Sequence, residues 1–190
     1  MILVGLLVVA AVSSFAGGNP GVRVYIDFDP PNYVSEYTPA PSELFRACVC
    51  VDKLTEGLMS VALRTEDPMT ACPGVFGAAT WTHLLPSSDP PLEPPWSGNG
   101  IFAISDYCYN DNPVVVGAID LRYLGGSCCL EILDHGMCAR WVVDCSNERE
   151  VDLYCVLAHG SVGGGPCPAG DCPQVPVARS SWGTIKDLNR

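Results

Sequence analysis

Apolar and polar residues alternate along most of this chain, and a period of two is the spacing of side chains on the two faces of a β-strand. The clearest case is Val22–Phe28, in which every second residue is apolar. Gly, Pro, Asn and Asp separate segments of this kind. The expected strands are 22–28, 45–51, 59–63, 75–82, 101–107, 114–123, 128–133, 140–145 and 151–157. The pattern predicts an all-β fold, an antiparallel β-sandwich, with a barrel as the alternative.

Length and composition favour one domain and exclude several classes of function. A chain of 190 residues has the length of a single domain, and its hydrophobic fraction of 48% is typical of a chain with a core rather than of a disordered one. The net charge of −11 is repelled by the phosphates of nucleic acids and by anionic lipids. We therefore expect no binding to nucleic acid.

The N-terminal residues predict export. Residues 2–12 form an apolar run without charge, and Ser14 and Ala16 are small residues three and one positions before Gly17. We interpret residues 1–16 as a signal peptide and expect a secreted or cell-surface protein. The run is shorter than the roughly 20 apolar residues of a membrane span, so no span is expected after cleavage. The alternative is the retained helix of a pilin-like filament subunit.

Eleven cysteines in an exported chain predict disulfide bonds, and the odd number leaves at least one thiol unpaired within the chain. A zinc site is disfavoured, because the cysteines do not form two closely spaced ligand pairs. Cys128 and Cys129 are adjacent on an expected strand, so their side chains should face opposite ways and bond to different partners. The disulfide candidates are Cys48, Cys50, Cys72, Cys108, Cys128, Cys129, Cys138, Cys145, Cys155, Cys167 and Cys172.

Two disulfides can be proposed from local sequence. Cys145 and Cys155 lie on the apolar faces of two successive expected strands, and a polar turn joins those strands. We therefore predict a disulfide between them, provided that the register brings their Cβ atoms together. Cys167 and Cys172 form the second expected pair, which lies in a linker and does not hold the core.

The domain limits follow from composition. The sandwich is expected to occupy residues 17–162, and a Gly/Pro-rich linker with a C-terminal peptide is expected at 163–190. In that peptide Trp182, Ile185 and Leu188 recur at a spacing of three residues. Such an apolar stripe suits docking or recognition by export machinery, and the alternative is a tail that packs on its own sandwich.

A second segment is also expected to lie outside the sheets. Residues 86–96 form a proline-rich loop, and proline lacks the N–H donor that a central strand requires. We expect Trp96 to fold back over the edge of the sandwich. An exposed row of aromatic residues beside this loop would support a binding module.

Few residues indicate catalysis. His83, His135 and His159 stand in different segments, and the sequence contains no Gly-x-Ser-x-Gly motif and no cysteine with the local signature of a protease nucleophile. We interpret the three histidines as surface or turn residues. No catalytic residue and no cofactor are predicted.

One loop is rich in oxygen ligands. Asp106, Asn110, Asp111 and Asn112 are candidates for a Ca²⁺ site, because carboxylate and amide oxygens are the ligands that this ion prefers. They do not follow the order of ligands in an EF-hand. The same residues are equally typical of a turn.

The C-terminal part of the chain resembles a known group. Residues 140–145, Tyr154–Leu157, His159-Gly160 and the peptide Ser181–Leu188 are similar to uncharacterised secreted bacterial proteins, whose sandwich is broadly like cohesin and immunoglobulin-like modules. The rest of the chain resembles this group only in pattern. The resemblance implies an exported protein and no reaction. The chain lacks a dockerin-type calcium repeat, so the sequence does not support a cellulosomal role.

The sequence therefore predicts a secreted or cell-surface, disulfide-stabilised β-sandwich with a non-enzymatic binding, structural or assembly role. The expected partner is a protein or a carbohydrate at the cell surface. Two alternatives remain: a pilin-like filament subunit and a secreted hydrolase, the latter requiring a cleft with paired acidic residues or an activated nucleophile.

Overall fold

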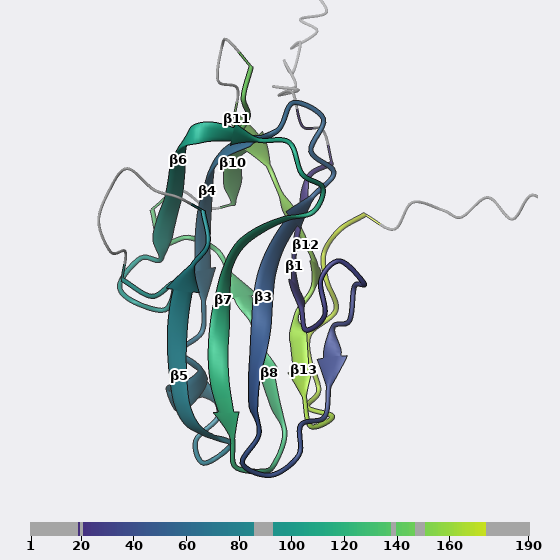
Figure 1. Ribbon diagram of the computed structural model, residues 1–190. Coiled ribbons are helices and arrows are strands. Elements are labelled where there is room, and N and C mark those ends of the chain that lie inside the picture. Colours follow the sequence, from purple (N-terminus) through teal and green to yellow (C-terminus); the bar gives the residue numbers. More distant parts are fainter. Residues whose placement is uncertain (1–18, 20, 86–92, 138–139, 147–150, 174–190) are drawn as a thin grey trace, which may run out of the picture.

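The computed structural model describes residues 19, 21–85, 93–137, 140–146 and 151–173, and these residues form a β-sandwich (Figure 1). Within them the helical content is a single turn, α1 (Pro68–Ala71). None of the described helices is long and apolar enough to cross a membrane. The strands are β1 (Arg23–Asp27), β2 (Glu36–Tyr37), β3 (Leu44–Asp52), β4 (Leu58–Thr65), β5 (Phe76–His83), β6 (Ile101–Tyr109), β7 (Val114–Tyr123), β8 (Cys128–Leu130), β9 (Ile132–Leu133), β10 (Trp141–Val143), β11 (Val151–Leu153), β12 (Cys155–Ala158) and β13 (Gly160–Val162).

The strands form two large sheets and a small third sheet. The order is β12-β1-β3-β7-β5 in the first and β11-β10-β4-β6 in the second, where β9 also pairs with β4. The third sheet has the order β2-β13-β8. Pairing is antiparallel except between β1 and β12 and between β2 and β13. The prediction of an all-β sandwich is confirmed, and the two parallel pairs are additions to it.

The core lies between the two large sheets and follows the alternation in the sequence. Val22, Val24 and Ile26 are fully buried in the main core cluster. The opposite face of the same sheet is also buried in part, because Tyr25 and Cys50 belong to a second cluster on that face. β3 consequently changes from alternating burial near Leu44 to continuous burial from Ala47 to Asp52.

Two of the expected strands are divided. The segment 128–133 is broken at Glu131 into β8 and β9, which pair in different sheets. The segment 151–157 is broken at Tyr154 into β11 and β12, and the chain crosses there from the second sheet to the first. Tyr154 is buried and donates its hydroxyl hydrogen to the carbonyl oxygen of Ala62 at 3.0 Å, which fixes the crossing point.

Eight cysteines of the described residues form four disulfides: Cys72–Cys128, Cys108–Cys145, Cys129–Cys167 and Cys155–Cys172. The prediction that Cys128 and Cys129 have different partners is confirmed. Cys138 lies outside the described residues.

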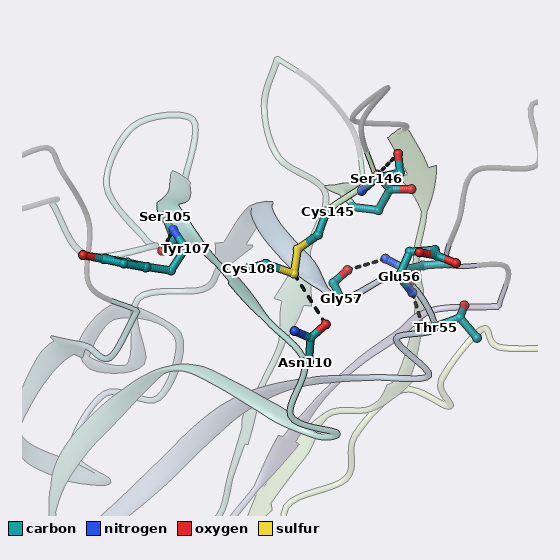
Figure 2. Close-up of a disulfide and its surroundings, with 11 residues drawn as sticks. Thr55, Glu56, Gly57, Ser105, Tyr107, Cys108, Asn110, Cys145 and Ser146 are labelled. Atoms are coloured by element: carbon teal, nitrogen blue, oxygen red, sulfur yellow. Dashed lines mark hydrogen bonds between the residues drawn. A yellow bond between two sulfur atoms is a disulfide. The ribbon is translucent and has the colours of Figure 1, made fainter.

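The predicted disulfide Cys145–Cys155 is wrong, although the hairpin that suggested it exists as the β10–β11 pair. Because the chain leaves that hairpin at Tyr154, Cys155 lies beside β1 in the other sheet. Cys145 bonds to Cys108 instead (Figure 2).

The segment from residue 163 to 173, expected as part of a linker, is attached to the sandwich. The predicted bond between Cys167 and Cys172 is wrong, because these residues bond to Cys129 and Cys155 respectively. Asp171 also accepts a hydrogen bond from the backbone N–H of Val156 at 2.7 Å. The expected signal peptide lies outside the described residues, and so does the N-terminal helix of the filament alternative. The expected C-terminal peptide, which contains Trp182, Ile185 and Leu188, also lies outside them.

Cys48 and Cys50 are free thiols in the structure, which corrects their place among the disulfide candidates. They are two residues apart on one face of β3, and both are buried against Tyr25 and Ala118. Burial raises the pKa of each thiol, most strongly that of Cys50, because a thiolate is poorly solvated there.

We expect Cys48 and Cys50 to react with a maleimide about a hundredfold more slowly in the native protein than in urea, because modification requires local opening and an ionised thiol. Peptide mapping by mass spectrometry measures the two sites separately from any other thiol. Comparable rates in the native and unfolded protein would contradict the burial of this face.

Candidate binding cleft

A cleft opens where β1 ends. β1 pairs with β3 only over Cys48–Asp52, whereas β7 pairs with β3 from Leu44 onward. Among the described residues, the first residues of β3 therefore have a strand neighbour on one side only. In Figure 1, β3 and β7 continue toward the lower end of the view after β1 has ended. The cleft has a volume of about 470 Å³ and is lined by Phe28, Asp29, Val34, Tyr37, Glu43, Leu44, Phe45 and Arg46.

Asp27 turns the chain out of the sheet and so creates the cleft. Its fully buried carboxylate accepts hydrogen bonds from the backbone N–H groups of Asp29 at 2.9 Å, Tyr33 at 3.0 Å and Val34 at 2.9 Å. These bonds replace the ladder partners that the chain loses when it leaves β3. The loop 28–34 is thereby held as a fixed wall of the cleft.

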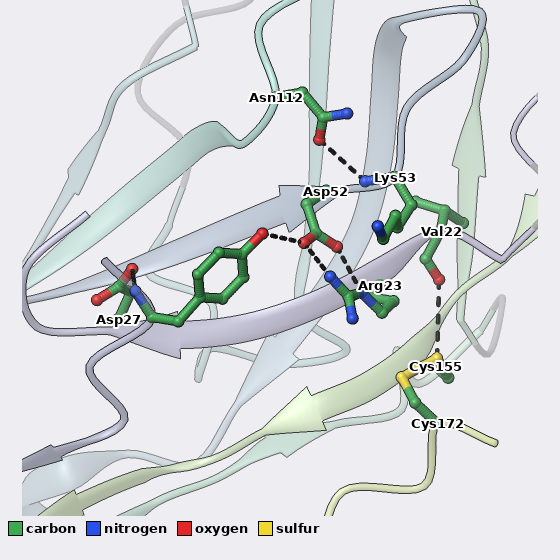
Figure 3. A network of polar contacts seen from close by, with 9 residues as sticks. Val22, Arg23, Asp27, Asp52, Lys53, Asn112, Cys155 and Cys172 are labelled. Atoms are coloured by element: carbon green, nitrogen blue, oxygen red, sulfur yellow. Dashed lines mark hydrogen bonds and ion pairs between the residues drawn. A yellow bond between two sulfur atoms is a disulfide. The ribbon is translucent and has the colours of Figure 1, made fainter. Parts of the chain in front are cut away.

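A second contact holds the same loop against the outer face of the sheet. The hydroxyl group of Tyr33 donates a hydrogen bond to Asp52 at 2.6 Å. Asp52 also accepts one from Nε of Arg23 at 2.8 Å (Figure 3). The ring of Tyr33 stacks on that of Tyr25 with centroids 4.9 Å apart. The bond to Asp52 raises the pKa of the Tyr33 hydroxyl and that of the Arg23 guanidinium, since each proton is held by the carboxylate.

Aromatic rings line the cleft. Tyr37 lies 5.4 Å from Phe45 and 5.7 Å from Phe28 between ring centroids, and Phe45 lies 6.0 Å from Phe28. Phe45 continues the row inward to Phe76 at 6.3 Å. Half-buried aromatic rings in such contact form a rigid apolar surface with little entropy to lose on binding.

The open side of β3 presents backbone groups to the cleft. The N–H of Tyr123 in β7 donates to the carbonyl oxygen of Glu43 at 2.9 Å. Because successive residues of a strand direct their backbone groups to opposite sides, Phe45 also faces β7, and Leu44 and Arg46 face the side that β1 has vacated. The cleft therefore combines an unpaired strand edge with an aromatic wall.

Glu43 and Tyr37 form a polar rim. The Tyr37 hydroxyl donates to Glu43 at 2.5 Å, and the backbone N–H of Ala40 donates to the same carboxylate at 2.6 Å. These bonds lower the pKa of Glu43, and the bond from Tyr37 contributes most; in turn the pKa of Tyr37 is raised. The rim is therefore negatively charged at neutral pH.

Arg46 and Asp120 form an ion pair beside the cleft, on the side away from Tyr37 and Glu43. Two nitrogens of Arg46 bind Asp120 at 2.7 and 3.0 Å, which lowers the pKa of this carboxyl. A hollow of about 340 Å³ continues the cleft there, lined by Leu44, Phe45, Arg46, Asp120 and Leu121. Leu44 projects between the two spaces with 71% of its surface exposed.

Three charged groups of this surface already have hydrogen-bond partners within the protein. Glu43 accepts from Tyr37 and Ala40, and Asp120 is paired with Arg46. No histidine or cysteine is among the described residues that line the two spaces.

Two of the four calcium candidates, Asn110 and Asn112, have structural contacts, and the side chain of Asp106 lies outside the described residues. The side-chain oxygen of Asn112 accepts a hydrogen bond from the backbone N–H of Lys53 at 2.9 Å (Figure 3). That of Asn110 lies 3.5 Å from the Cys108 sulfur, beside the disulfide in Figure 2. Across the described part of the chain, no three His, Cys, Asp or Glu side chains gather as metal ligands would.

The histidines are less exposed than expected. His135 is buried, and its Nδ1 accepts a hydrogen bond from the N–H of Met137 at 3.2 Å. Nδ1 of His159 accepts from the N–H of Ile132 at 3.1 Å. Burial lowers the pKa of these two histidines and of His83. The described contacts place His135 and His159 in structural roles.

The cleft could not be located from the sequence pattern. An exposed aromatic row beside the loop 86–96 would have supported a binding module, but residues 86–92 lie outside the described residues. Trp96 is half-buried and packs on the core, as expected for that residue. The expected strands gave no signal, because 22–28 and 45–51 are equally long, whereas in the structure β1 has 5 residues and β3 has 9. Unequal lengths of neighbouring strands leave an open edge.

No protein-family model matches this chain, and no curated protein matches its sequence. Solved structures that are similar to it at low identity include the following three. CaCohA2 of Clostridium acetobutylicum has a TM-score of 0.46 and 11% identity, covering 80% of this chain and 96% of that chain. The third cohesin ScaC of Acetivibrio cellulolyticus, in complex with the ScaB dockerin, has a TM-score of 0.43 and 12% identity, and the match covers 76% of this chain and 99% of that chain. The seventh ScaB type I cohesin of Pseudobacteroides cellulosolvens has a TM-score of 0.40 and 10% identity, and the match covers 78% of this chain and 95% of that chain. All three are weak matches.

Proposed function

We propose that this chain is an exported, non-enzymatic binding module that takes an extended segment of a partner protein into the cleft beside β3. The open edge at Leu44–Arg46 carries the proposal, because an unpaired strand edge offers main-chain hydrogen bonds to another strand. The aromatic wall of Phe28, Tyr37 and Phe45 supplies pockets for the side chains of that segment. The four disulfides support an oxidising compartment outside the cytoplasm.

Selection from a random peptide library tests this function and requires no identified partner. We expect the selected peptides to bind in an extended form, so N-methylation of alternate residues in one register should weaken binding about tenfold or more, and in the other register should have little effect. Isothermal titration calorimetry measures both series.

The matched variants are Leu44→Asp in the cleft and Leu124→Asp outside it, since both leucines are exposed. Leu44→Asp is expected to weaken binding of the selected peptides about tenfold, and Leu124→Asp to leave it unchanged. Equal affinities for the two variants would overturn the assignment of the cleft. Binding of glycans instead of any peptide would overturn the class of partner.

A further inference from the structure

We propose that the cleft takes its partner segment antiparallel to β3, with one apolar residue pointing into the aromatic wall and with basic residues beside Asp29 and Glu43. The inference rests on the proposed function, because both concern the open edge of β3. It adds the direction of the partner segment, its register and the class of side chain that the cleft accepts.

The direction follows from the strand that β3 loses. β1 is antiparallel to β3, and its last pair is Asp27 opposite Cys48. A segment that continues the line of β1 beyond this pair reaches Arg46 and then Leu44, whose backbone groups face the vacated side. An antiparallel segment extends the existing ladder without a change in hydrogen-bond pattern, and antiparallel pairing is slightly more stable per residue than parallel pairing. The partner therefore runs in the direction of β1.

The register decides which side chains enter the cleft. Directly opposed residues of an antiparallel pair place their side chains on the same face of the sheet. Phe45 packs on the main core cluster, as Ala47 and Val49 do, whereas Leu44 and Arg46 are exposed on the outer face. The partner residue opposite Phe45 therefore points inward, and its two neighbours point outward.

The inward position selects an apolar side chain. It faces the rings of Phe28, Tyr37 and Phe45, whose centroids lie 5.4 to 6.0 Å apart. An apolar side chain gains from burial against these rings, whereas a charged one loses hydration there. One inward apolar residue is therefore the expected anchor of the segment.

The charges of the lining favour a basic segment. Asp29 and Glu43 contribute two carboxylates to the cleft. Among the described residues that line it, the one cation is Arg46, which is already paired with Asp120 at 2.7 Å. The lining therefore has an excess of negative charge, in a chain whose net charge is −11. A lysine or arginine of the partner meets complementary charge there, and an acidic residue is repelled.

Both carboxylates can accept further hydrogen bonds. Asp29 is exposed, and one of its oxygens accepts from the side-chain amide of Asn32 at 2.9 Å. The two oxygens of Glu43 accept from the Tyr37 hydroxyl and from the N–H of Ala40. An ionised carboxylate has about four acceptor positions, so a basic residue can bind each group without breaking these contacts. The existing bonds also hold the carboxylates in place, which reduces the entropy lost on binding.

Charge-neutralising variants test the choice of side chain with peptides selected from the random library. Asp29→Asn and Glu43→Gln should each weaken binding about threefold, and the double variant about tenfold. The matched control is Glu36→Gln, because Glu36 is an exposed carboxylate outside the lining, and it should leave the affinity unchanged. Isothermal titration calorimetry measures all four proteins.

Salt gives an independent measure of the same attraction. Raising the salt concentration from about 50 mM to about 500 mM should weaken binding to the parent protein about tenfold, because screening shortens the reach of charge. The double variant should lose less than about threefold over the same range. Equal salt dependence of the parent and the double variant would overturn the role of the two carboxylates.

A spin label on a selected peptide tests the direction. A nitroxide at the N-terminal end of the bound peptide should broaden the amide signals of the loop 28–34, and one at the C-terminal end should broaden those of Ser42 and Glu43. The reversed pattern would show parallel pairing and would overturn the inference.

The outcomes separate this inference from the proposed function. If selected peptides bind and Leu44→Asp weakens them, but they lack basic residues and their binding does not depend on salt, the inference is wrong and the proposed function stands. If neither basic nor neutral peptides bind in the cleft, the proposed function is wrong, and the inference falls with it.

Discussion

Replacing Asp27 with alanine is expected to lower the free energy of unfolding by about 4 kcal/mol. The carboxylate is fully buried and accepts three backbone hydrogen bonds, from Asp29, Tyr33 and Val34. Alanine leaves these part-buried donors without their acceptor, and a hydrogen bond to a charged group contributes about 1.5–3 kcal/mol. The effect is large against a typical total of about 5–15 kcal/mol. Urea unfolding followed by tryptophan fluorescence measures it.

Asp27→Asn is the matched control. Its amide oxygen keeps one acceptor at the same place, so we expect a smaller loss of stability than in the alanine variant. Because the bonds to Asp27 hold the wall of the cleft, the alanine variant should also bind selected peptides more weakly under conditions where it remains folded. A loss of stability below about 1 kcal/mol in Asp27→Ala would show that the loop is held by other contacts.

Removing the disulfide Cys72–Cys128 by a double substitution to alanine is expected to lower the free energy of unfolding by about 4 kcal/mol on the chain-entropy estimate. The bond closes a separation of 56 residues and joins the end of α1 to the buried start of β8. A longer closed loop restricts the unfolded chain more, so its loss has the larger effect.

The comparison is the double alanine variant of Cys155 and Cys172, whose separation is 17 residues. The same estimate gives a loss of about 3 kcal/mol for this bond. Denaturant unfolding of both variants beside the parent protein tests the order. If the Cys155–Cys172 variant loses more stability than the Cys72–Cys128 variant, then contacts made by residues 163–173 in the folded state outweigh the entropy of the unfolded chain.

The strands were the part of the fold most accessible from sequence. The prediction for 114–123 coincides with β7, and that for 45–51 lies within β3. In β3 the core residues Ala47, Val49 and Val51 fall at every second position. In β7 they do so over Val114 and Val116 and again over Ile119, Leu121 and Tyr123. This periodicity is a property of neighbouring residues, so it is visible before the partner strand is identified.

Pairing was not accessible in the same way. The turn between β10 and β11 predicted a hairpin, and that hairpin exists, but the disulfide inferred from it does not. The outcome depended on Tyr154, where the chain crosses between sheets with its hydroxyl bonded to Ala62. Disulfide bonds require two Cβ atoms to approach closely, and such proximity between distant residues is decided by packing.

The sequence by itself determined the class of fold and most of the strand segments, because both follow from local periodicity and composition. The cleft was decided only by the tertiary structure. It exists because β1 stops at Asp27 while β3 continues to Leu44, and because loop 28–34 is tied back by a buried carboxylate. An open strand edge is defined by the absence of a neighbour in space, and no pattern along one segment encodes which neighbour is missing.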